Sequence, residues 1–191
     1  YASNAFLATK ITFINELANL CEKTGINIED ISIGMGLDKR IGSRFLRAGP
    51  AYGGSCFPKD TKAIVSTSDK FKTNLTLIKS VIRSNHNRTN ILLNRIYTIL
   101  KKKIKNKKIT FLGVTFKANT DDMRDSSSLT MIPNLSKKGA IIRYFDPTGY
   151  KKEFKKIKNV SYVNSIKKSL EGADLVIIHT EWNDFKSINF K

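Results

Sequence analysis

The stretch AYGGSCFPKD, residues 51–60, places a cysteine directly after two glycines and a serine. Gly53 and Gly54 allow the backbone to turn where side chains would clash, or to pass close to a ligand. Pro58 suits the first turn of a helix, so Cys56 is expected just ahead of a helix N-terminus. The positive end of that helix would favour the thiolate form of the cysteine.

Two charged residues follow the cysteine closely. Lys59 adds a positive charge beside the sulfur. Asp60 lies four residues after Cys56, one helical turn along, where it could face the same pocket as a base or a water-orienting group. A thiolate with a nearby acid–base group can attack a carbonyl carbon covalently. The alternative is a tight turn that carries a cysteine without any chemical role.

The bulk composition is that of a globular protein with a strongly basic charge. The 191 residues include 40% hydrophobic and 26% charged side chains and carry a net charge of +18, which argues against disorder. A basic chain can bind nucleic acid, a membrane surface or an anionic small molecule. The lysines concentrate in KKKIKNKK at 101–108, where no aromatic residue is interleaved for stacking. We interpret this run as a solvated helix end and linker, and expect no nucleic-acid partner and no membrane.

The other cysteine, Cys21, follows the apolar spacing of a helix and is expected in the core. Neither cysteine has a second Cys or a His at metal-ligand spacing, so no metal site is predicted. No apolar run is long enough to cross a bilayer. Two cysteines without an export signal are typical of the reducing cytoplasm, which is the expected location.

The first half of the chain has helical periodicity. Residues 1–23 carry two neighbouring apolar stripes, Leu7, Ile11, Ile14, Ala18 and Cys21 beside Phe6, Phe13, Leu17 and Leu20. Such a wide apolar face fits a helix buried between its own domain and a partner chain, and equally fits the central helix of one core. A short helix is expected within 27–42, a helix from Pro58, and a long helix with apolar positions from Ile78 to Ile104.

The period changes after the lysine run. Short β-rich segments at 108–114, 140–146, 160–163 and 174–180 alternate with helical segments. This alternation predicts a parallel sheet with right-handed crossovers. The predicted fold class is therefore α/β, with an all-helical domain at 1–105 followed by a Rossmann-like parallel α/β domain at 106–191.

Ligands of such sheets bind beyond the carboxyl ends of the strands. The loop after the first strand, residues 115–128, carries Lys117 and Arg124 and ends at serines that could start a helix. A helix N-terminus with two nearby cations suits a phosphate group. The chain contains no G-x-G-x-x-G fingerprint, so a dinucleotide-binding domain of the usual kind is not expected within it.

Four segments carry a family resemblance: NAFLATKITFINELANLCEKTG (4–25), GLDKRIGSRFLRAGPAYGGSCFPKD (36–60), FLGVTFKANTDDMRDSSS (111–128), and the landmarks YFDP and VIIHTEWNDF in 144–185. In the same order, they resemble the central helix, the cysteine-bearing substrate loop and the nucleotide-sugar-binding domain of the UDP-glucose 6-dehydrogenase family. The resemblance implies NAD-dependent oxidation of UDP-glucose to UDP-glucuronate in two steps.

The resemblance also assigns catalytic roles. Cys56 matches the nucleophile that captures the intermediate aldehyde as a thiohemiacetal, which becomes a thioester that water hydrolyses. Asp60 matches an aspartate that works with an ordered water in proton transfer, and Asn4 an asparagine that holds the oxyanion and water. A catalytic lysine of the family would fall just before Tyr1.

Substrate contacts are implied in both halves of the chain. Phe45, Tyr52 and Gly53 match a loop that wraps the sugar nucleotide. Phe116 and Lys117 match contacts from the last domain, with Lys117 as a cation for the diphosphate. The alternative for the two phenylalanines is a place in the core.

Three further cations have a counterpart in the family. Arg40 matches an arginine that reaches into the neighbouring subunit's site, which implies a homodimer formed through the central helix. Lys59 and Arg124 match residues near bound NAD. The alternative for both arginines is an ordinary surface position.

The resemblance covers only the central and C-terminal parts of the family's chain. The N-terminal NAD-binding Rossmann domain is expected to be absent, so these 191 residues are predicted to be inactive alone, which an assay with NAD and UDP-glucose would check. A partial sequence, a split gene and an engineered fragment all fit. Open alternatives are a dehydrogenase acting on GDP-mannose or a UDP-N-acetyl-hexosamine, and a non-catalytic, dimerising UDP-sugar-binding remnant.

Overall fold

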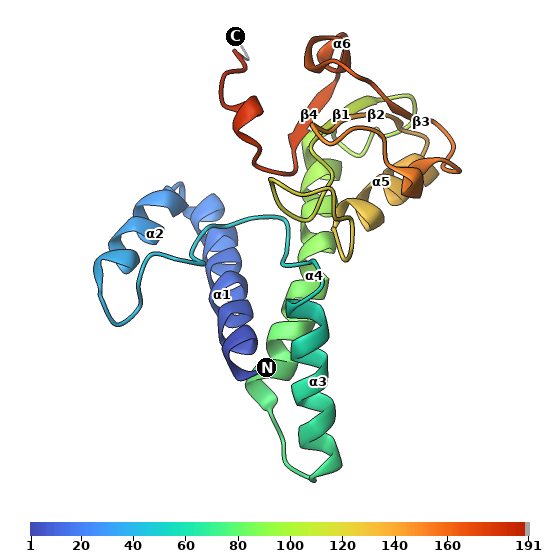
Figure 1. Ribbon diagram of the computed structural model, residues 1–191. Coiled ribbons are helices and arrows are strands. Elements are labelled where there is room, and N and C mark those ends of the chain that lie inside the picture. The colour runs from blue at the N-terminus through green and yellow to red at the C-terminus, as the bar shows by residue number, and fades with distance from the viewer. Residues whose placement is uncertain (190–191) are drawn as a thin grey trace. The chain divides into compact units, whose positions relative to one another are not determined.

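The computed structural model describes residues 1–189, and the chain divides into two compact units between Asn90 and Ile91. The first unit is helical and the second contains a parallel sheet (Figure 1). The predicted α/β fold class, helices first and a parallel sheet second, is confirmed. None of the helices formed by residues 1–189 is long and apolar enough to span a bilayer.

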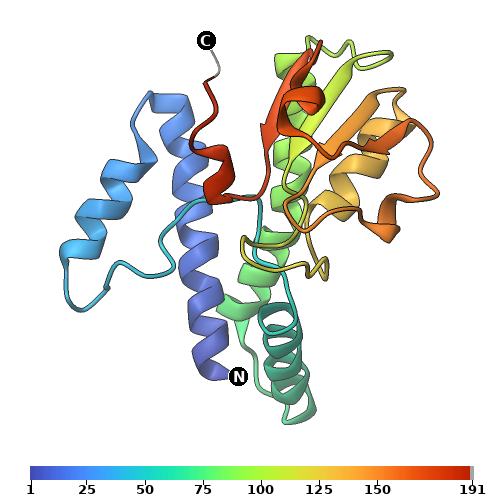
Figure 2. The ribbon, with the colours of Figure 1, turned by 45° about the horizontal axis from the view of Figure 1, so that its top comes forward.

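The first unit contains α1 (Ala2–Thr24), α2 (Ile28–Leu37), α3 (Phe57–Lys70) and the first part of α4 (Thr76–Ile99). Their ends follow local chemistry. Gly25 ends α1 in a left-handed conformation with φ 74°, and the side chain of Asn27 accepts a hydrogen bond at the start of α2. Residues 38–56 join α2 to α3, and the irregular segment 43–56 forms most of this connection, which is visible in Figure 2.

Helix α1 packs against α2 and α3. Its first apolar stripe is turned inward, since Ile14 and Cys21 are buried as expected. The second stripe stays largely open, because Phe6, Phe13 and Leu20 are 65%, 48% and 59% exposed. One chain therefore covers only part of the wide apolar face of α1.

The second unit contains a four-stranded parallel sheet in the order β3-β2-β1-β4. The strands are β1 (Lys108–Leu112), β2 (Ile141–Phe145), β3 (Val160–Tyr162) and β4 (Leu175–Ile178). Helix α5 (Ser128–Lys137) and the short α6 (Ile166–Leu170) form part of the crossovers. Of two 3₁₀ turns, η1 (Lys152–Phe154) lies between β2 and β3, and η2 (Asn183–Phe185) follows β4.

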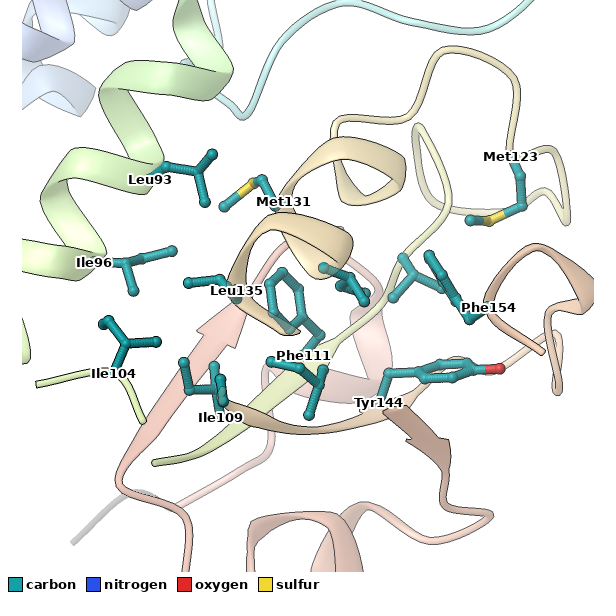
Figure 3. Close-up of a cluster of buried hydrophobic side chains, with 14 residues drawn as sticks. Leu93, Ile96, Ile104, Ile109, Phe111, Met123, Met131, Leu135, Tyr144 and Phe154 are labelled. Carbon is teal, nitrogen blue, oxygen red and sulfur yellow. The ribbon is translucent and has the colours of Figure 1, made fainter. Parts of the chain in front are cut away.

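Alternation along β1 divides the core between the two faces of the sheet. On one face, Ile109 and Phe111 are fully buried in a cluster with side chains from the end of α4 and from α5, such as Ile96 and Leu135 (Figure 3). On the other face, Leu112 packs with Trp182 and Phe185. Both faces are covered, which explains the nearly continuous apolar runs in the strands.

The expected long helix ends earlier than its apolar pattern suggests. Helix α4 stops at Ile99, and Lys101 and Lys102 take left-handed conformations with φ 50° and 61°. Ile104 is therefore not on the helix, although it is buried in the sheet cluster. The 3.6-residue spacing continued into a turn because the same core receives both segments.

Gly113 shows how tightly the segment after β1 is packed. Its φ is 73°, and a Cβ atom there would lie 2.6 Å from Cβ of Thr180. We expect Gly113→Ala to lower the free energy of unfolding by about 2–4 kcal/mol, because backbone strain and overpacking add. Urea denaturation measures the change.

Gly149→Ala is the matched control for this prediction. Gly149 has φ 86°, but no other atom lies within 4 Å of the place that a Cβ would take, so only the backbone cost of about 1 kcal/mol is expected. Equal losses of stability in the two variants would contradict the close approach at Gly113.

Candidate functional site

The irregular segment 43–56 is held by polar side chains of the helices beside it. The side-chain oxygen of Asn15 on α1 accepts a hydrogen bond from the Gly49 N–H at 2.7 Å, and Arg88 on α4 donates to the Gly49 carbonyl at 3.1 Å. Arg88 is buried and also donates to the Asn15 carbonyl and to Asn19. This loop has no regular backbone hydrogen bonding, and these side chains supply hydrogen-bond partners for its backbone at Gly49.

Asn85 fixes the loop at the residue that precedes the glycines. Its side chain accepts from the Tyr52 N–H at 2.8 Å and donates to the Tyr52 carbonyl at 3.0 Å. The Tyr52 ring is buried against Ala8 and Val81. This double contact sets the position of the chain just before it reaches the cysteine.

The cysteine lies where the sequence predicts it. Gly54, buried like Gly53, turns the chain with φ 78°, and Cys56 is the N-cap residue of α3. The Cys56 side chain is exposed, with its Sγ 3.6 Å from the Ser55 hydroxyl oxygen. An accessible sulfur at the positive end of a helix has the setting of a reactive thiol.

Asp60 lies one turn into α3, with its N–H bonded to the Cys56 carbonyl at 2.8 Å. Its carboxylate is buried and accepts hydrogen bonds from the Lys59 ammonium and from Asn4 Nδ2, the latter at 2.5 Å. These donors, Lys59 first and then Asn4, lower the pKa of Asp60. The carboxylate is therefore ionised at neutral pH and held in one orientation, which suits it to align a water molecule.

Lys59 shares this arrangement from the exposed side. Its pKa is raised, chiefly by the hydrogen bond to Asp60. Its ammonium also lies 5.6 Å from the centre of the Tyr1 ring. The structure thus brings Asn4 of α1 to Lys59 and Asp60 in the first turn of α3, which begins at the cysteine.

Phe45 lies at the edge of the loop rather than in the core. It is 38% exposed and has φ 65°, a conformation that is strained for a bulky side chain. Its ring meets Phe57 edge-on at 6.0 Å between centroids, and Phe57 meets Tyr52 in the same way at 6.1 Å. The three rings form an aromatic row next to the cysteine turn.

Among the described residues, Arg40 forms no hydrogen bond to Asn4, Lys59 or Asp60. Its side chain is 89% exposed and pairs with Asp38 at 2.6 Å. The pair raises the pKa of Arg40 and lowers that of Asp38. The guanidinium is thus presented to solvent just after α2.

In the second unit, the segment after β1 is anchored at the carboxyl edge of the sheet. The Val114 N–H donates to the buried Asp146 carboxylate at 2.8 Å. The Val114 carbonyl accepts from the hydroxyls of Ser126 and Ser128 at 2.7 and 2.6 Å. The end of the loop 115–128 is therefore tied back to Val114, the residue just before its start. The serines that were expected near a phosphate instead hold the loop closed.

His179, directly after β4, closes the same network. Its Nε2 lies 2.7 Å from the Ser127 hydroxyl and its Nδ1 3.1 Å from the Thr180 hydroxyl, which donates to the Thr115 carbonyl at 2.7 Å. Burial lowers the pKa of His179 to about 4. The ring is therefore neutral at physiological pH and acts as a connector.

Three expected contact residues are carried by this loop. Phe116 is half-buried and its ring lies 5.4 Å from the Lys117 ammonium, which is exposed. Arg124 pairs with Asp122 at 2.7 Å and lowers the pKa of that carboxyl. Phe116 and Lys117 thus place an exposed cation over a half-buried ring, whereas Arg124 already has an acidic partner.

Sequence reasoning missed the residues that hold the two loops. Three of them lie on the inward faces of helices: Asn15, Asn85 and Arg88. The sequence feature that could have indicated them is a polar residue within an apolar helical stripe. Asp146 and His179 each follow a strand at its carboxyl end. Among the described residues, no group of His, Cys, Asp and Glu could hold a metal ion.

Comparison with known proteins identifies the family. The central-domain model of the UDP-glucose/GDP-mannose dehydrogenase family matches residues 1–87, and the UDP binding domain model of the same family matches 110–191. The chain belongs to this family. The resemblance seen in the sequence is thereby confirmed.

Named relatives agree with this assignment. A UDP-glucose 6-dehydrogenase from Rickettsia typhi is 46% identical over 193 residues, covering 100% of this chain and 44% of the relative. One from Bacillus subtilis is 46% identical, covering 97% of the chain and 42% of the relative. The structure of a UDP-glucose dehydrogenase from Pyrobaculum islandicum matches with a TM-score of 0.93 and 33% identity, covering 100% of the chain and 44% of that protein. The chain thus spans less than half the length of these relatives.

The buried, neutral His179 predicts a pH effect on stability. The unfolded chain takes up a proton below pH about 6.5, the folded chain only near pH 4. Stability contributed by the neutral ring is full above pH 6.5 and is lost as the pH falls toward 4, by up to about 3 kcal/mol.

His179→Gln should lack this part of the pH dependence, whereas His86→Gln should keep it because His86 is exposed. The measurement is the free energy of unfolding from urea titrations at several pH values between 4 and 7. If His179→Gln showed the same pH dependence of unfolding free energy as the parent between pH 4 and 7, His179 would not be its cause.

Proposed function

We propose that this chain is the cysteine-bearing and UDP-sugar-binding part of an NAD-dependent UDP-glucose 6-dehydrogenase. The observation that carries the proposal is the exposed Cys56 at the N-cap of α3, one turn before the buried, ionised Asp60. Membership of the family and the names of the relatives support it.

Cys56 is the proposed nucleophile. Its thiolate would attack the carbonyl carbon of the sugar aldehyde, forming a C–S bond while the carbonyl electron pair moves to oxygen, which takes a proton. Holding the aldehyde covalently prevents its escape before the second oxidation. In the second oxidation the thiohemiacetal carbon would lose a hydride, with NAD as the proposed acceptor, and its hydroxyl a proton, which gives a thioester. Water would then cleave the thioester, releasing the carboxylate and returning the thiol.

Asn4 is proposed to donate a hydrogen bond to the oxyanion, and Asp60 to orient the hydrolytic water. The Asn4 amide is fixed by its hydrogen bond to Asp60, so its remaining donor capacity has a defined direction. Ionised Asp60 can align the hydrolytic water and accept its proton. Lys59 keeps Asp60 ionised through the hydrogen bond described above.

UDP-glucose is the proposed substrate. Phe45, Tyr52 and Gly53 belong to the anchored loop and are proposed to wrap the sugar nucleotide. In the second unit, half-buried Phe116 offers a ring for stacking and exposed Lys117 a cation for the diphosphate. The family model for this unit is described as a UDP binding domain.

NAD is the proposed cofactor, and when bound it would accept one hydride in each oxidation. The residues of this chain do not by themselves form a dinucleotide cradle, since the sequence has no G-x-G-x-x-G turn. Lys59 and Arg124, both exposed cations, are proposed to lie beside it. Their part would be electrostatic and not the main binding contact.

A homodimer formed through the central helix is the proposed assembly. Phe6, Phe13 and Leu20 recur every seven residues along α1 and are exposed within one chain. Covering such a stripe removes apolar surface from water. Arg40, exposed after α2, is proposed to reach the site of the partner subunit.

The covalent role is tested in the complete enzyme that contains these residues. Cys56→Ala should lower UDP-glucuronate formation by on the order of 10³-fold or more, because no thiolate remains to capture the aldehyde. Product is quantified by chromatography alongside NADH absorbance. Cys21→Ala is the control, as Cys21 is buried and has no proposed role in the reaction. Full two-step turnover by Cys56→Ala would refute the proposal.

The dimer is tested by Phe13→Glu, which places a charge in the exposed stripe. The dissociation constant of the dimer should rise about tenfold or more, measured by analytical ultracentrifugation. Phe71→Glu is the matched control, because Phe71 is 72% exposed at the end of α3 and lies outside the stripe. A parent protein that sediments as a monomer at all concentrations would contradict the proposed assembly.

A further inference from the structure

A cavity of about 770 Å³ lies beside the end of α4, within the second unit. Its lining includes Tyr97 and four lysines, Lys102, Lys103, Lys105 and Lys138. The volume is in the range of small-molecule binding sites. No carboxylate belongs to the lining.

The backbone adopts a costly conformation to form this cavity. After α4 ends, Lys101 and Lys102 both have positive φ, 50° and 61°, where glycine or asparagine is the usual residue. The Lys102 N–H donates to the Tyr97 carbonyl at 2.7 Å, and the Lys101 N–H to the Thr98 carbonyl at 3.0 Å. These bonds turn the chain back beside the last turn of the helix, so the lysines gather around Tyr97.

The charge of the cavity is uncompensated within residues 1–189. Other lysines of this unit do have acidic partners, as in the pairs of Lys107 with Asp174 and of Lys151 with Asp146. For the four lining lysines, no ion pair with a carboxylate is found in the described part of the chain. Like charges around one cavity repel each other, and a bound polyanion would relieve that repulsion.

Tyr97 gives the cavity an aromatic wall. The Lys138 ammonium lies 5.1 Å from the centre of its ring, and buried Ile104 is beside it in the lining. Burial raises the pKa of Tyr97, so the phenol adds no negative charge. A half-buried ring among cations can stack on a planar base while the cations contact phosphates.

We propose that this cavity binds a nucleoside polyphosphate, with the phosphate chain among the lysines and the base against Tyr97. Its position separates it from the proposed substrate contacts of the same unit, Phe116 and Lys117. Residues 94–105 come before β1 and Lys138 comes before β2, so the cavity lies at the amino-terminal edge of the parallel sheet. Phe116 and Lys117 follow the carboxyl end of β1.

The experiment is isothermal titration calorimetry on the purified protein at low salt, with UDP-glucose present in excess. The probes are ATP, inorganic tripolyphosphate and orthophosphate. ATP and tripolyphosphate should bind about tenfold or more tightly than orthophosphate, because several lysines act together. Tyr97→Leu should weaken ATP binding severalfold and leave tripolyphosphate binding unchanged.

Charge reversal at Lys103 and Lys138, both to Glu, should weaken ATP binding about tenfold or more. Reversal of the exposed Lys155 and Lys156 to Glu is the matched control, because it changes the net charge equally outside the cavity. Circular dichroism checks that the variants are folded, and the single substitutions Lys103→Gln and Lys138→Gln should give smaller losses in the same direction.

Three outcomes would overturn the proposal. Equal weakening in both reversal variants would mean that only net charge matters. ATP binding that is found only when UDP-glucose is left out would place ATP in the substrate site. Binding to phosphatidylserine vesicles that is lost on reversal at Lys103 and Lys138, without ATP binding, would make the lysines a membrane-contact surface.

Discussion

The structure of the helical unit depends on hydrogen bonds from the buried Arg88 and nearby asparagines to the backbone of a loop. This loop has no regular hydrogen bonding of its own. Residues 43–56 contain too many glycines and turns to pair with themselves, yet part of this backbone is buried. Side chains of α1 and α4 supply the missing partners. Because a buried backbone group without a partner costs about 1–3 kcal/mol, these contacts select one path for the loop.

That path determines where the proposed chemistry would occur. The loop delivers Gly54 and Cys56 to the start of α3, and the first turn of α3 then carries Lys59 and Asp60. Asn4 reaches Asp60 from another helix, so the carboxylate is held from two sides. The sulfur stays exposed while its neighbours are fixed, which is the setting that the proposed nucleophilic role requires.

The sheet unit uses a different solution to the same problem. The loop after β1 is closed by hydroxyl groups, Asp146 and neutral His179, which tie its ends to the carboxyl edge of the sheet. On this closed loop Lys117 remains exposed and Phe116 is half-buried beside it. At the opposite edge, the four lysines that line the cavity beside the end of α4 form no ion pair with a carboxylate among the described residues, whereas the neighbouring Lys107 pairs with Asp174.

Local chemistry in the sequence was enough to predict the helices, the parallel strands and the cysteine at a helix start. Hydrophobic periodicity and the positions of glycine and proline are local features of a sequence. They were therefore sufficient to predict α1, α3 and the alternation of strands with helices. The end of α4 did not follow, because Ile104 continues the apolar spacing beyond the last helical residue and enters the same core from a turn.

The sequence by itself determined which residues could do chemistry: Cys56, Asp60 and the cations around them. Only the tertiary structure decided which of them meet and what holds them. Asn4 and Asp60 are 56 residues apart, Tyr52 and Asn85 are 33 apart, and Ser127 and His179 are 52 apart. Such contacts depend on how helices and strands pack, and polar residues on inward faces give no local sign of their partner. Packing also left Phe6, Phe13 and Leu20 of α1 exposed within one chain, which periodicity alone cannot distinguish from a buried face.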